Sequence, residues 1–305
     1  MKNATIRQFQ IFSVAAAHLS FARASEELNL TLAAVSLQIK QLEEVSGIKL
    51  FDRIGKRVFL TEGGQILLRY AREVLQALKS ADTALAELRD PKTGQVSIAV
   101  TSTAEYFAPG LLARFLMIHP DVRVRLVIEN RSDVAKLLMA NEVDMAIMGR
   151  PPARMDSQAA SIAPHPFVIV ASANHPLARK KQVQVEEIAK EAMIVREAGS
   201  GTRNAMEGFF KDHGIDPEIG MEMSSNEAIK QAVMAGLGLS FISQHTLGSE
   251  IASKKLAILN VSGMPVMRHW FLVRHRSKNV TSAMTSLWDF IVSYAPAYLE
   301  QKTED

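Results

Sequence analysis

Two groups of side chains in this 305-residue chain have the types and spacing to bind anions. The first is a basic cluster of Arg53, Lys56 and Arg57 around Gly55. Guanidinium and ammonium groups on a tight turn suit contact with DNA phosphates or the minor groove. In isolation such a cluster is an ordinary solvated turn, so its meaning depends on the elements beside it.

The second group follows a series of predicted strands and opens predicted helices. It consists of hydroxyl, amide and arginine side chains with one glycine: Ser102, Thr103, Asn130, Arg131, Arg150, Ser200, Gly201, Thr202, Arg203 and Asn226. Free N–H groups at a helix start favour an anion. Each loop taken singly is a cap or a turn, but arginines and hydroxyls converging on strand ends predict a small anionic ligand. His269 either faces the same crevice or fills a core beside Trp270.

No residues are assigned to catalysis or to metal binding. The eight histidines are scattered without metal-ligand spacing, and the chain contains no cysteine. A nucleophile elbow, a phosphate-binding loop and a complete dinucleotide fingerprint are also missing. We therefore expect no cofactor. The start of the sequence does not read as a signal peptide, and no apolar run reaches the roughly 18 residues of a membrane helix, so we expect a cytoplasmic protein.

The basic cluster follows a predicted helix-turn-helix. Ser20 is the expected cap of the first helix of the pair, Asn29–Leu30 forms the turn, and Thr31 is the expected cap of the second helix. A wing with its turn near Gly55 follows, over residues 47–61. A unit of this kind presents one helix to the DNA major groove, and beside it the basic cluster is expected to contact DNA.

The second helix of the pair has a core side and an outward side. Val35, Ile39 and Leu42 lie within one arc and are expected to face the core. The outward arc then carries small, polar and basic residues: Ala33, Ser36, Leu37 and Lys40. Leu37 is apolar, although it lies on a face that is expected to be exposed to solvent. It is either a solvent-exposed or dimer-contact leucine, or it contacts a thymine methyl group.

A long helix is predicted from about residue 62 to 88, and it carries a sustained apolar stripe. It would span roughly 40 Å at 1.5 Å per residue. A unit of sixty residues cannot cover such a stripe, so we expect two chains to pair along it. Asp90–Gly94 then ends the helix and marks a linker.

From Gln95 onward, short apolar strands alternate with helices. This alternation predicts a mainly parallel sheet with helices on both faces, and ligands then bind in a crevice at the strand ends or between subdomains. The expected domains are residues 1–60 for DNA binding, 61–90 for the linker and dimerisation helix, and 91–305 for regulation. Within the last, subdomain I spans about 95–165 and 270–305, and subdomain II spans about 166–269.

These elements in this order resemble the LysR-type transcriptional regulators across essentially the whole chain. A narrower resemblance, to the CbbR branch that regulates Calvin-cycle (RuBisCO) operons, is carried by short segments that include Ser102–Ala104, Tyr106–Pro109, Asn141–Asp144, Val195–Glu197, Gly199–Arg203, Gly220–Ala232 and Arg268–Trp270. The resemblance implies an α+β multidomain fold, with a winged helix-turn-helix, a long linker helix and two α/β subdomains like those of periplasmic binding proteins.

The resemblance also implies function and partners. A regulator of this type is not an enzyme; it binds double-stranded promoter DNA as a homotetramer built as a dimer of dimers, and RNA polymerase is a further partner. Effectors of the CbbR branch are phosphorylated metabolites or nucleotides such as ribulose bisphosphate, phosphoglycolate or NADPH. The alternatives are a LysR-type regulator of another metabolic operon with a carboxylate effector, and a cytoplasmic α/β receptor or enzyme.

The family's site residues transfer position by position. Thr31, Leu32, Ala33, Ser36 and Leu37 match its base-facing positions, and Arg53 matches its wing arginine. The loops at Ser102, Asn130, Arg150, Thr202 and Asn226 match its effector crevice. Two positions depart from the pattern. Leu32–Ala33 stands where Gln-Pro is common, which removes a bidentate reader of adenine. Arg150 stands where the CbbR branch usually has glutamine, which adds a cation to the crevice.

Overall fold

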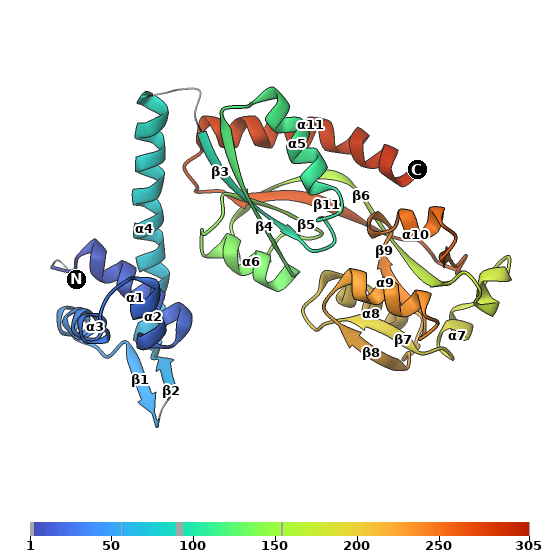
Figure 1. Cartoon of the computed structure of the whole chain (residues 1–305), viewed down its shortest axis with the longest axis horizontal. Coiled ribbons are helices and arrows are strands. Elements are labelled where there is room, and N and C mark those ends of the chain that lie inside the picture. Colours follow the sequence, from blue (N-terminus) through green and yellow to red (C-terminus); the bar gives the residue numbers. More distant parts are fainter. Residues whose placement is uncertain (1–2, 56, 90–93, 154, 305) are drawn as a thin grey trace. The chain divides into compact units, whose positions relative to one another are not determined.

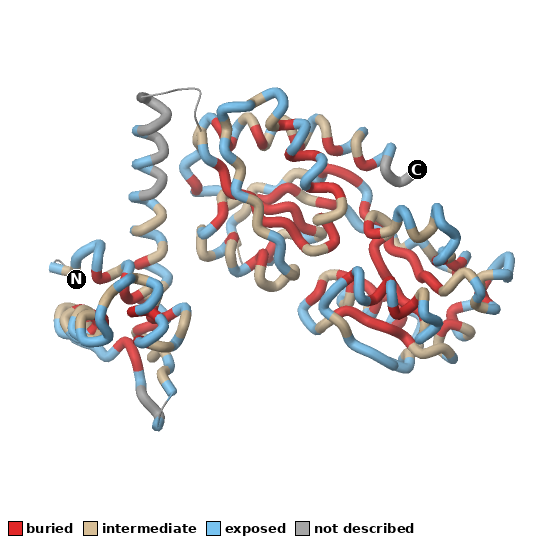
Figure 2. Tube along the Cα trace, in the orientation of Figure 1, coloured by how far each residue is buried: buried red, intermediate tan, exposed pale blue. Residues whose placement is uncertain are grey.

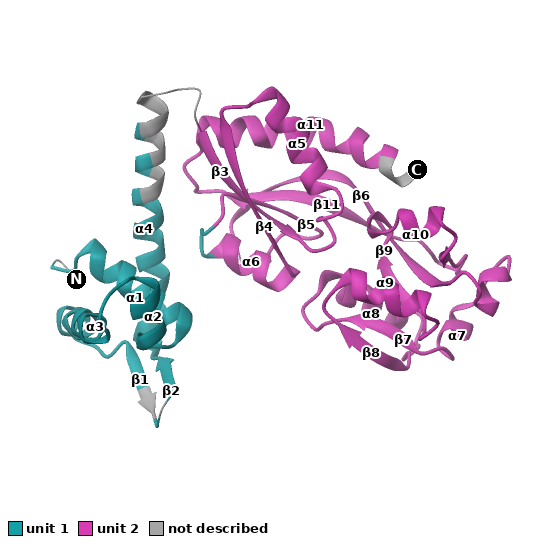
Figure 3. Ribbon diagram, viewed as in Figure 1, with its two compact units in different colours: residues 1–89, 140–142 teal, residues 90–139, 143–305 magenta. Residues whose placement is uncertain are grey.

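A computed structural model describes residues 3–55, 57–89, 94–153 and 155–304. The chain divides into two compact units (Figure 3), of which unit 1 comprises residues 1–89 with 140–142 and unit 2 comprises residues 90–139 with 143–305. Each unit is described by itself below. Within the described residues, no helix combines the length and the apolar character that crossing a membrane requires.

Unit 1 begins with three helices: α1 (Ile6–His18), α2 (Phe21–Glu27) and α3 (Leu32–Ser46). The N-caps predicted at Ser20 and Thr31 are confirmed, and Thr5 caps α1 in the same way. The side-chain oxygens of Thr5, Ser20 and Thr31 each accept a hydrogen bond from the backbone N–H three residues later, at 3.1–3.3 Å. The turn between α2 and α3 passes through Asn29, whose φ of 52° lies in the left-handed region that asparagine tolerates.

The predicted wing is a two-stranded antiparallel ribbon of β1 (Phe51–Ile54) and β2 (Arg57–Leu60). Gly55 stands in the turn with a φ of 63°, a conformation that glycine adopts without a steric cost. The predicted long helix is α4 (Glu62–Arg89). Apolar side chains from all these elements share one core, in which Phe12, Ile39 and Phe51 are buried. Figure 2 colours the trace of each unit by how far its residues are buried.

The first half of unit 2 is built on a sheet that helices cover on both faces (Figure 1). Its strands β3 (Gly94–Thr101), β4 (Val122–Glu129) and β5 (Met145–Met148) are parallel. Helices α5 (Ala108–Ile118) and α11 (Ser282–Glu304) pack on one face, and α6 (Arg131–Met139) packs on the other. This arrangement brings the ends of β3 and β5 and the start of α6 to one edge.

Two long antiparallel strands, β6 (Ser157–Ser172) and β11 (Val266–His275), extend the same sheet. The second half of unit 2 begins on β6, to which β9 (Ser240–Ser243) and β10 (Leu256–Ile258) pair. Alternate residues of β6 enter two cores: Ile169 packs in the core of α8 (Gly201–Asp212), and Val168 packs in the core of α9 (Asn226–Met234).

The remaining elements complete the second half. Strands β7 (Met193–Arg196) and β8 (Ile219–Met223) form a separate two-stranded parallel sheet. Four short helical segments are α7 (Val185–Ile188), α10 (Ser249–Ala252) and the 3-10 turns η1 (Pro176–Arg179) and η2 (Gln244–Thr246).

The large sheet is mixed, so the prediction of a mainly parallel sheet was wrong for half of it. Only β3, β4 and β5 pair in parallel, whereas β6, β9, β10 and β11 pair antiparallel. The full length of β6 was not predictable from the sequence. Its first half is only partly buried, and Pro164 and Pro166 lie in the middle of the strand, where proline is rare. The helix α11 was also absent from the predicted elements.

Candidate DNA-contacting surface and anion-binding cavity

The outward side of α3 is open to solvent as predicted. Leu32 and Leu37 are 51% and 52% exposed, and Thr31, Ala33 and Lys40 are exposed as well, while Ser36 is half-buried. Val35, Ile39 and Leu42 face the core and are buried. Two leucines that stay exposed on a short capped helix make this surface suited to close contact with another molecule. The contact of these residues with DNA stays a prediction.

Glu43 fixes the wing to the end of α3. Its carboxylate accepts hydrogen bonds from the backbone N–H groups of Leu50 at 2.8 Å and Phe51 at 3.3 Å, and it pairs with Lys49 at 3.1 Å. Of the predicted wing cations, Arg57 is exposed at the start of β2. Arg53 stands in β1 opposite Val58, and Lys56 lies outside the described residues.

Unit 2 contains a cavity of about 550 Å³ that residues from both of its halves line. The first half contributes Thr101, Ser102, Thr103, Arg131, Gly149 and Arg150, and the second half contributes Arg196, Ser200, Gly201, Thr202, Asn204 and Ala205. The long strands β6 and β11 contribute His165, Phe167, Met267, Arg268, His269 and Phe271. The volume is that of a small-molecule site.

Two arginines give the cavity an uncompensated positive charge. Within the described part of the chain, the side chain of neither Arg131 nor Arg150 forms a hydrogen bond or an ion pair. Burial lowers the pKa of Arg131, and the positive charge of Arg150 lowers it further. Like charges left together in a cavity favour a bound anion, because an anion removes their repulsion.

The start of α8 stands against Arg131. The Ser200 hydroxyl accepts a hydrogen bond from the N–H of Thr202 at 3.2 Å and caps the helix. A Cβ at Gly201 would lie 3.3 Å from the Cδ of Arg131, so glycine allows this side chain to lie against the first turn. The helix start adds partial positive charge to the guanidinium groups.

Arg196, at the end of β7, is a cavity residue that the sequence analysis did not assign. It is 2% exposed, and it pairs with Glu197 at 2.8 Å. Its guanidinium also donates to Asn226 Oδ1 at 2.6 Å and to Ser102 Oγ at 3.0 Å. The bond to Ser102 joins the two halves of unit 2. The signal available in the sequence was a charged residue that ends an apolar strand just before the Gly199–Arg203 loop.

His165 is a second cavity residue that was missed. Its ring stacks on Trp270 with centroids 3.8 Å apart, and its Nε2 lies 2.9 Å from Ser243 Oγ. Burial holds the pKa of His165 well below its usual value, and nearby His245 lowers it further, so the ring is neutral at physiological pH. Of the two positions expected for His269, the structure shows the one at the cavity, where His269 is exposed, whereas Trp270 is fully buried.

Eight of the eleven predicted effector residues line the cavity, and three lie outside it. Asn130 caps α6, because its side chain accepts from the N–H of Asp133 at 3.0 Å. Arg203 turns away from the cavity and pairs with Glu207 at 2.6 Å. Asn226 is buried behind Arg196 and donates to the carbonyl of Ser102 at 3.2 Å. Successive residues of a helix point about 100° apart, which separates Arg203 from Thr202.

Comparison with known families matches both units. A model of the bacterial regulatory helix-turn-helix protein of the lysR family matches residues 6–65. A model of the LysR substrate binding domain matches residues 89–296, the part of the chain that contains the cavity.

Among the described residues, no three His, Asp or Glu side chains come together in a way that could hold a metal ion.

Three similar proteins have informative names. The HTH-type transcriptional regulator CfxR of Cupriavidus necator is 43% identical over 295 residues, which cover 97% of this chain and 93% of that protein. A RuBisCO operon transcriptional regulator of Allochromatium vinosum is 41% identical over 291 residues, which cover 95% of this chain and 96% of that protein. The solved CcmR regulatory domain of Synechocystis, in complex with 2-PG, is 35% identical with a TM-score of 0.64, covering 67% of this chain and 98% of that domain.

Proposed function

The chain belongs to the LysR family of DNA-binding transcriptional regulators, and from this premise we propose that it regulates carbon-fixation genes in response to a small phosphorylated metabolite. The relative from Allochromatium vinosum is named a RuBisCO operon transcriptional regulator, the relative from Cupriavidus necator is named a transcriptional regulator, and neither name is that of an enzyme. A bacterial regulator of this kind acts on the chromosome, so the proposed site of action is the cytoplasm.

The proposed class of effector rests on two cavity arginines, Arg131 and Arg150, whose side chains have no counter-charge among the residues that the structure describes. Arg131 and Arg150 face one cavity with the start of α8, and burial together with Arg150 lowers the pKa of Arg131. A phosphate dianion would neutralise both guanidinium groups and accept hydrogen bonds from both, and arginine binds phosphate with a matching geometry. The bound ligand of the CcmR domain, 2-phosphoglycolate, belongs to this chemical class.

The hydroxyl groups of the cavity are proposed to bind the remainder of the effector. Ser102, Thr103 and Thr202 lie in the same cavity as the arginine pair, and His269 and Arg268 stand exposed beside them. A hydroxyl group donates to a carboxylate and accepts from an alcohol. The proposed effector is therefore a short molecule with a phosphate at one end and a polar group at the other.

The DNA half of the proposal rests on α3 and the wing. We propose that the exposed residues at the start of α3 enter the major groove, while Arg53, Lys56 and Arg57 contact the backbone or the minor groove. Leu32 and Leu37 can contact only apolar groups such as thymine methyls. The operator is consequently expected to differ from those of relatives that have glutamine at position 32.

Assembly is proposed to follow from α4. Its exposed apolar side chains repeat at helical spacing: Ile66, Tyr70, Val74, Leu78 and Leu85. Pairing of two copies along this stripe would present two reading heads to a two-fold operator. Association of two such pairs gives the proposed dimer of dimers, and contact of the bound tetramer with RNA polymerase is proposed as the route to activation.

Fluorescence anisotropy of labelled promoter fragments tests the DNA half. We expect tight binding to fragments upstream of a RuBisCO operon and of the chain's own gene. Affinity should fall by about a thousandfold between roughly 50 and 200 mM salt, because neutralised phosphates release counterions. Equal affinity for every fragment of matched length and base composition would refute specific promoter recognition.

Isothermal titration with 2-phosphoglycolate and with glycolate tests the effector half. These two probes differ only by the phosphate. Arg131→Gln and Arg150→Gln should each weaken 2-phosphoglycolate by about tenfold or more while leaving basal DNA affinity unchanged. Arg125→Gln, at an exposed position of β4 outside the cavity, is the matched control. Equal affinity for both probes would instead support a carboxylate effector.

A further inference from the structure

The loop between β3 and α5, residues 102–107, has two faces. On one face, Ser102 and Thr103 line the cavity. On the other face, Tyr106 extends to α9 in the other half of unit 2, where its hydroxyl donates a 2.7 Å hydrogen bond to Glu227 Oε1. A single short loop therefore contacts both the proposed effector site and the opposite half of the unit.

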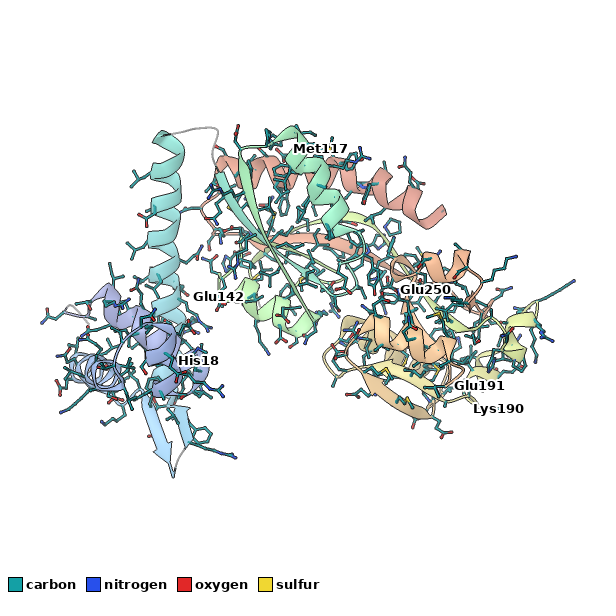
Figure 4. All side chains as sticks on the ribbon, viewed as in Figure 1. His18, Met117, Glu142, Lys190, Glu191 and Glu250 are labelled. Atoms are coloured by element: carbon teal, nitrogen blue, oxygen red, sulfur yellow. The ribbon has the colours of Figure 1, made fainter. Side chains whose placement is uncertain are left out.

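Lys230 is the buried anchor on the far side of this contact, although Glu227 itself is 55% exposed. The Lys230 side chain is 3% exposed, and its ammonium group lies 2.8 Å from Glu250 and 2.7 Å from Glu227 and donates to the carbonyl of Thr246 at 3.0 Å. Glu250, on α10, is labelled in Figure 4. The ammonium group also lies 4.8 Å from the centroid of the Tyr106 ring. Tyr106 therefore contacts both the buried ammonium group of Lys230 and the carboxylate of Glu227 that pairs with it.

The hydroxyl of Tyr106 is held in its donor form. Burial raises the pKa of Tyr106, and the hydrogen bond to Glu227 raises it further. The group therefore stays protonated throughout the physiological range. A hydrogen bond from a neutral hydroxyl to a carboxylate is stronger than one between neutral groups.

The contact is continuous with the cavity through one residue. Asn226 precedes Glu227 at the start of α9, and it accepts from Arg196 and donates to the carbonyl of Ser102. Arg196 and Ser102 both line the cavity. Separation of the two halves of unit 2 at this point would break the bonds of Ser102 to Arg196 and Asn226 together with the bond of Tyr106 to Glu227.

We infer that Tyr106 is a positioning residue that clasps the two halves of unit 2 around the effector cavity by bonding to Glu227 on the Lys230 anchor. It touches no ligand; it sets the fraction of molecules in which Ser102 and Arg196 are close enough to form one site. The apparent affinity of a ligand scales with the fraction of the binding-competent state. The clasp is a property of the chain by itself, and it rests on the proposed function only for the choice of ligand probe.

A measurement without ligand tests the clasp directly. The chain has no cysteine, so spin labels can be placed at Met117→Cys in the first half and Lys190→Cys in the second, both exposed positions. Full-length labelled chain is mixed with excess unlabelled chain. The distances measured by double electron–electron resonance then arise between two labels within one chain. Wild type should give one narrow distribution. Tyr106→Phe should broaden it, and Tyr106→Leu, which also removes the ring beside Lys230, should broaden it further.

Affinity for 2-phosphoglycolate supplies the second readout. Tyr106→Phe and Glu227→Ala should each raise its dissociation constant by about fivefold, and the double variant should cost less than the product because both changes break one bond. Basal affinity for promoter DNA should stay unchanged in these variants, and the unfolding midpoint should stay unchanged in Tyr106→Phe, which keeps the ion pair of Glu227 with Lys230. Tyr294→Phe is the matched control, because Tyr294 stacks on Phe290 and Tyr298 within α11 and lies in one half only.

The outcomes separate the clasp from the proposed effector. Broadened distances with weakened probe binding support the clasp. Broadened distances in a chain that does not bind 2-phosphoglycolate also support it, and they refute the proposed effector instead. An unchanged distance distribution in Tyr106→Phe and in Tyr106→Leu overturns the clasp, whatever the probe affinity.

Discussion

Asp144 and Lys278 form a buried ion pair that ties the segment before α11 to the start of β5. The ammonium group of Lys278 lies 2.7 Å from Asp144 Oδ1 and donates to the carbonyl of Val143 at 3.2 Å. The other carboxylate oxygen accepts from the N–H and the hydroxyl of Ser97, each at 2.7 Å. The Lys278 side chain is 3% exposed and that of Asp144 is 18% exposed, so most of the pair lies out of water and the loss of either charge is costly.

We expect Asp144→Asn to lower the free energy of unfolding by about 3 kcal/mol at pH 7, because Lys278 stays buried without a counter-charge. Urea unfolding of the full chain measures the difference. Asp156→Asn is the control: Asp156 pairs with Arg276 at 2.8 Å, but both side chains are about two-thirds exposed. Loss of such a surface pair should cost at most about 1 kcal/mol. Equal losses in the two variants would contradict the role given to burial.

The same pair predicts the direction of the pH dependence. Burial alone would raise the pKa of Asp144, but Lys278 and the hydrogen bonds from Ser97 outweigh burial and lower it. Asp144 therefore stabilises the fold above the unfolded-state value of about 3.9, and this contribution is lost as the pH falls through the lower pKa of the folded state. The difference in the free energy of unfolding between wild type and Asp144→Asn should therefore decrease over that acid range.

At the scale of elements, the orientation of the wing depends on the end of α3. The helix ends at Gly47, whose φ of 72° gives a left-handed C-cap, and the chain then turns into β1. Glu43, one turn earlier, accepts from the first N–H groups of the wing strand. The predicted reading helix and the predicted phosphate-contacting turn are thereby fixed to each other by one carboxylate.

Glu43→Ala should leave the N–H groups of Leu50 and Phe51 without their acceptor and should cost about 1–3 kcal/mol of local stability. We expect promoter affinity, measured by anisotropy, to fall by about tenfold as the wing loses its fixed orientation. Glu44→Ala is a matched control one residue away, since Glu44 is exposed and pairs only distantly with Lys40 at 3.8 Å. An equal loss of affinity in both variants would show that negative charge matters here rather than position.

At the scale of the whole molecule, α4 has more apolar surface than its own unit covers. Leu67 and Ala71 are buried in the core of unit 1, whereas Tyr70, Val74 and Leu78 on the neighbouring face stay exposed. An amphipathic helix whose apolar stripe remains in water gains free energy by pairing with another such helix. The proposed partner is a second copy of this chain.

Val74→Glu should therefore raise the dissociation constant of the dimer by about a hundredfold, since each copy buries a charge where it buried a valine. Sedimentation velocity across a concentration series measures the association. Gln65→Glu adds the same charge at an exposed position on another side of the helix and should leave association unchanged. Val74→Glu with the sedimentation coefficient of wild type at every concentration would argue against pairing along this stripe.

Features that depend on neighbours in sequence were predictable. The caps at Ser20 and Thr31, the turn at Asn29, the wing turn at Gly55 and the extent of α4 each follow from a residue type and a periodicity of a few positions. Strand ends followed by hydroxyls and arginines also predicted eight of the residues that line the cavity. Local backbone geometry and hydrophobic burial act over such short spans, so the sequence alone determines them.

Only the tertiary structure decided which of the polar residues share the cavity. It brings Arg196 and His165 into the lining from β7 and β6, it turns Arg203 toward Glu207, and it places Asn226 behind Arg196. Tyr106 and Glu227 meet across 121 positions of sequence. These outcomes depend on the antiparallel pairing of β6 with β11 and on rotations of about 100° per helical residue, and neither the partner of a strand nor the final orientation of a side chain is encoded by its immediate neighbours.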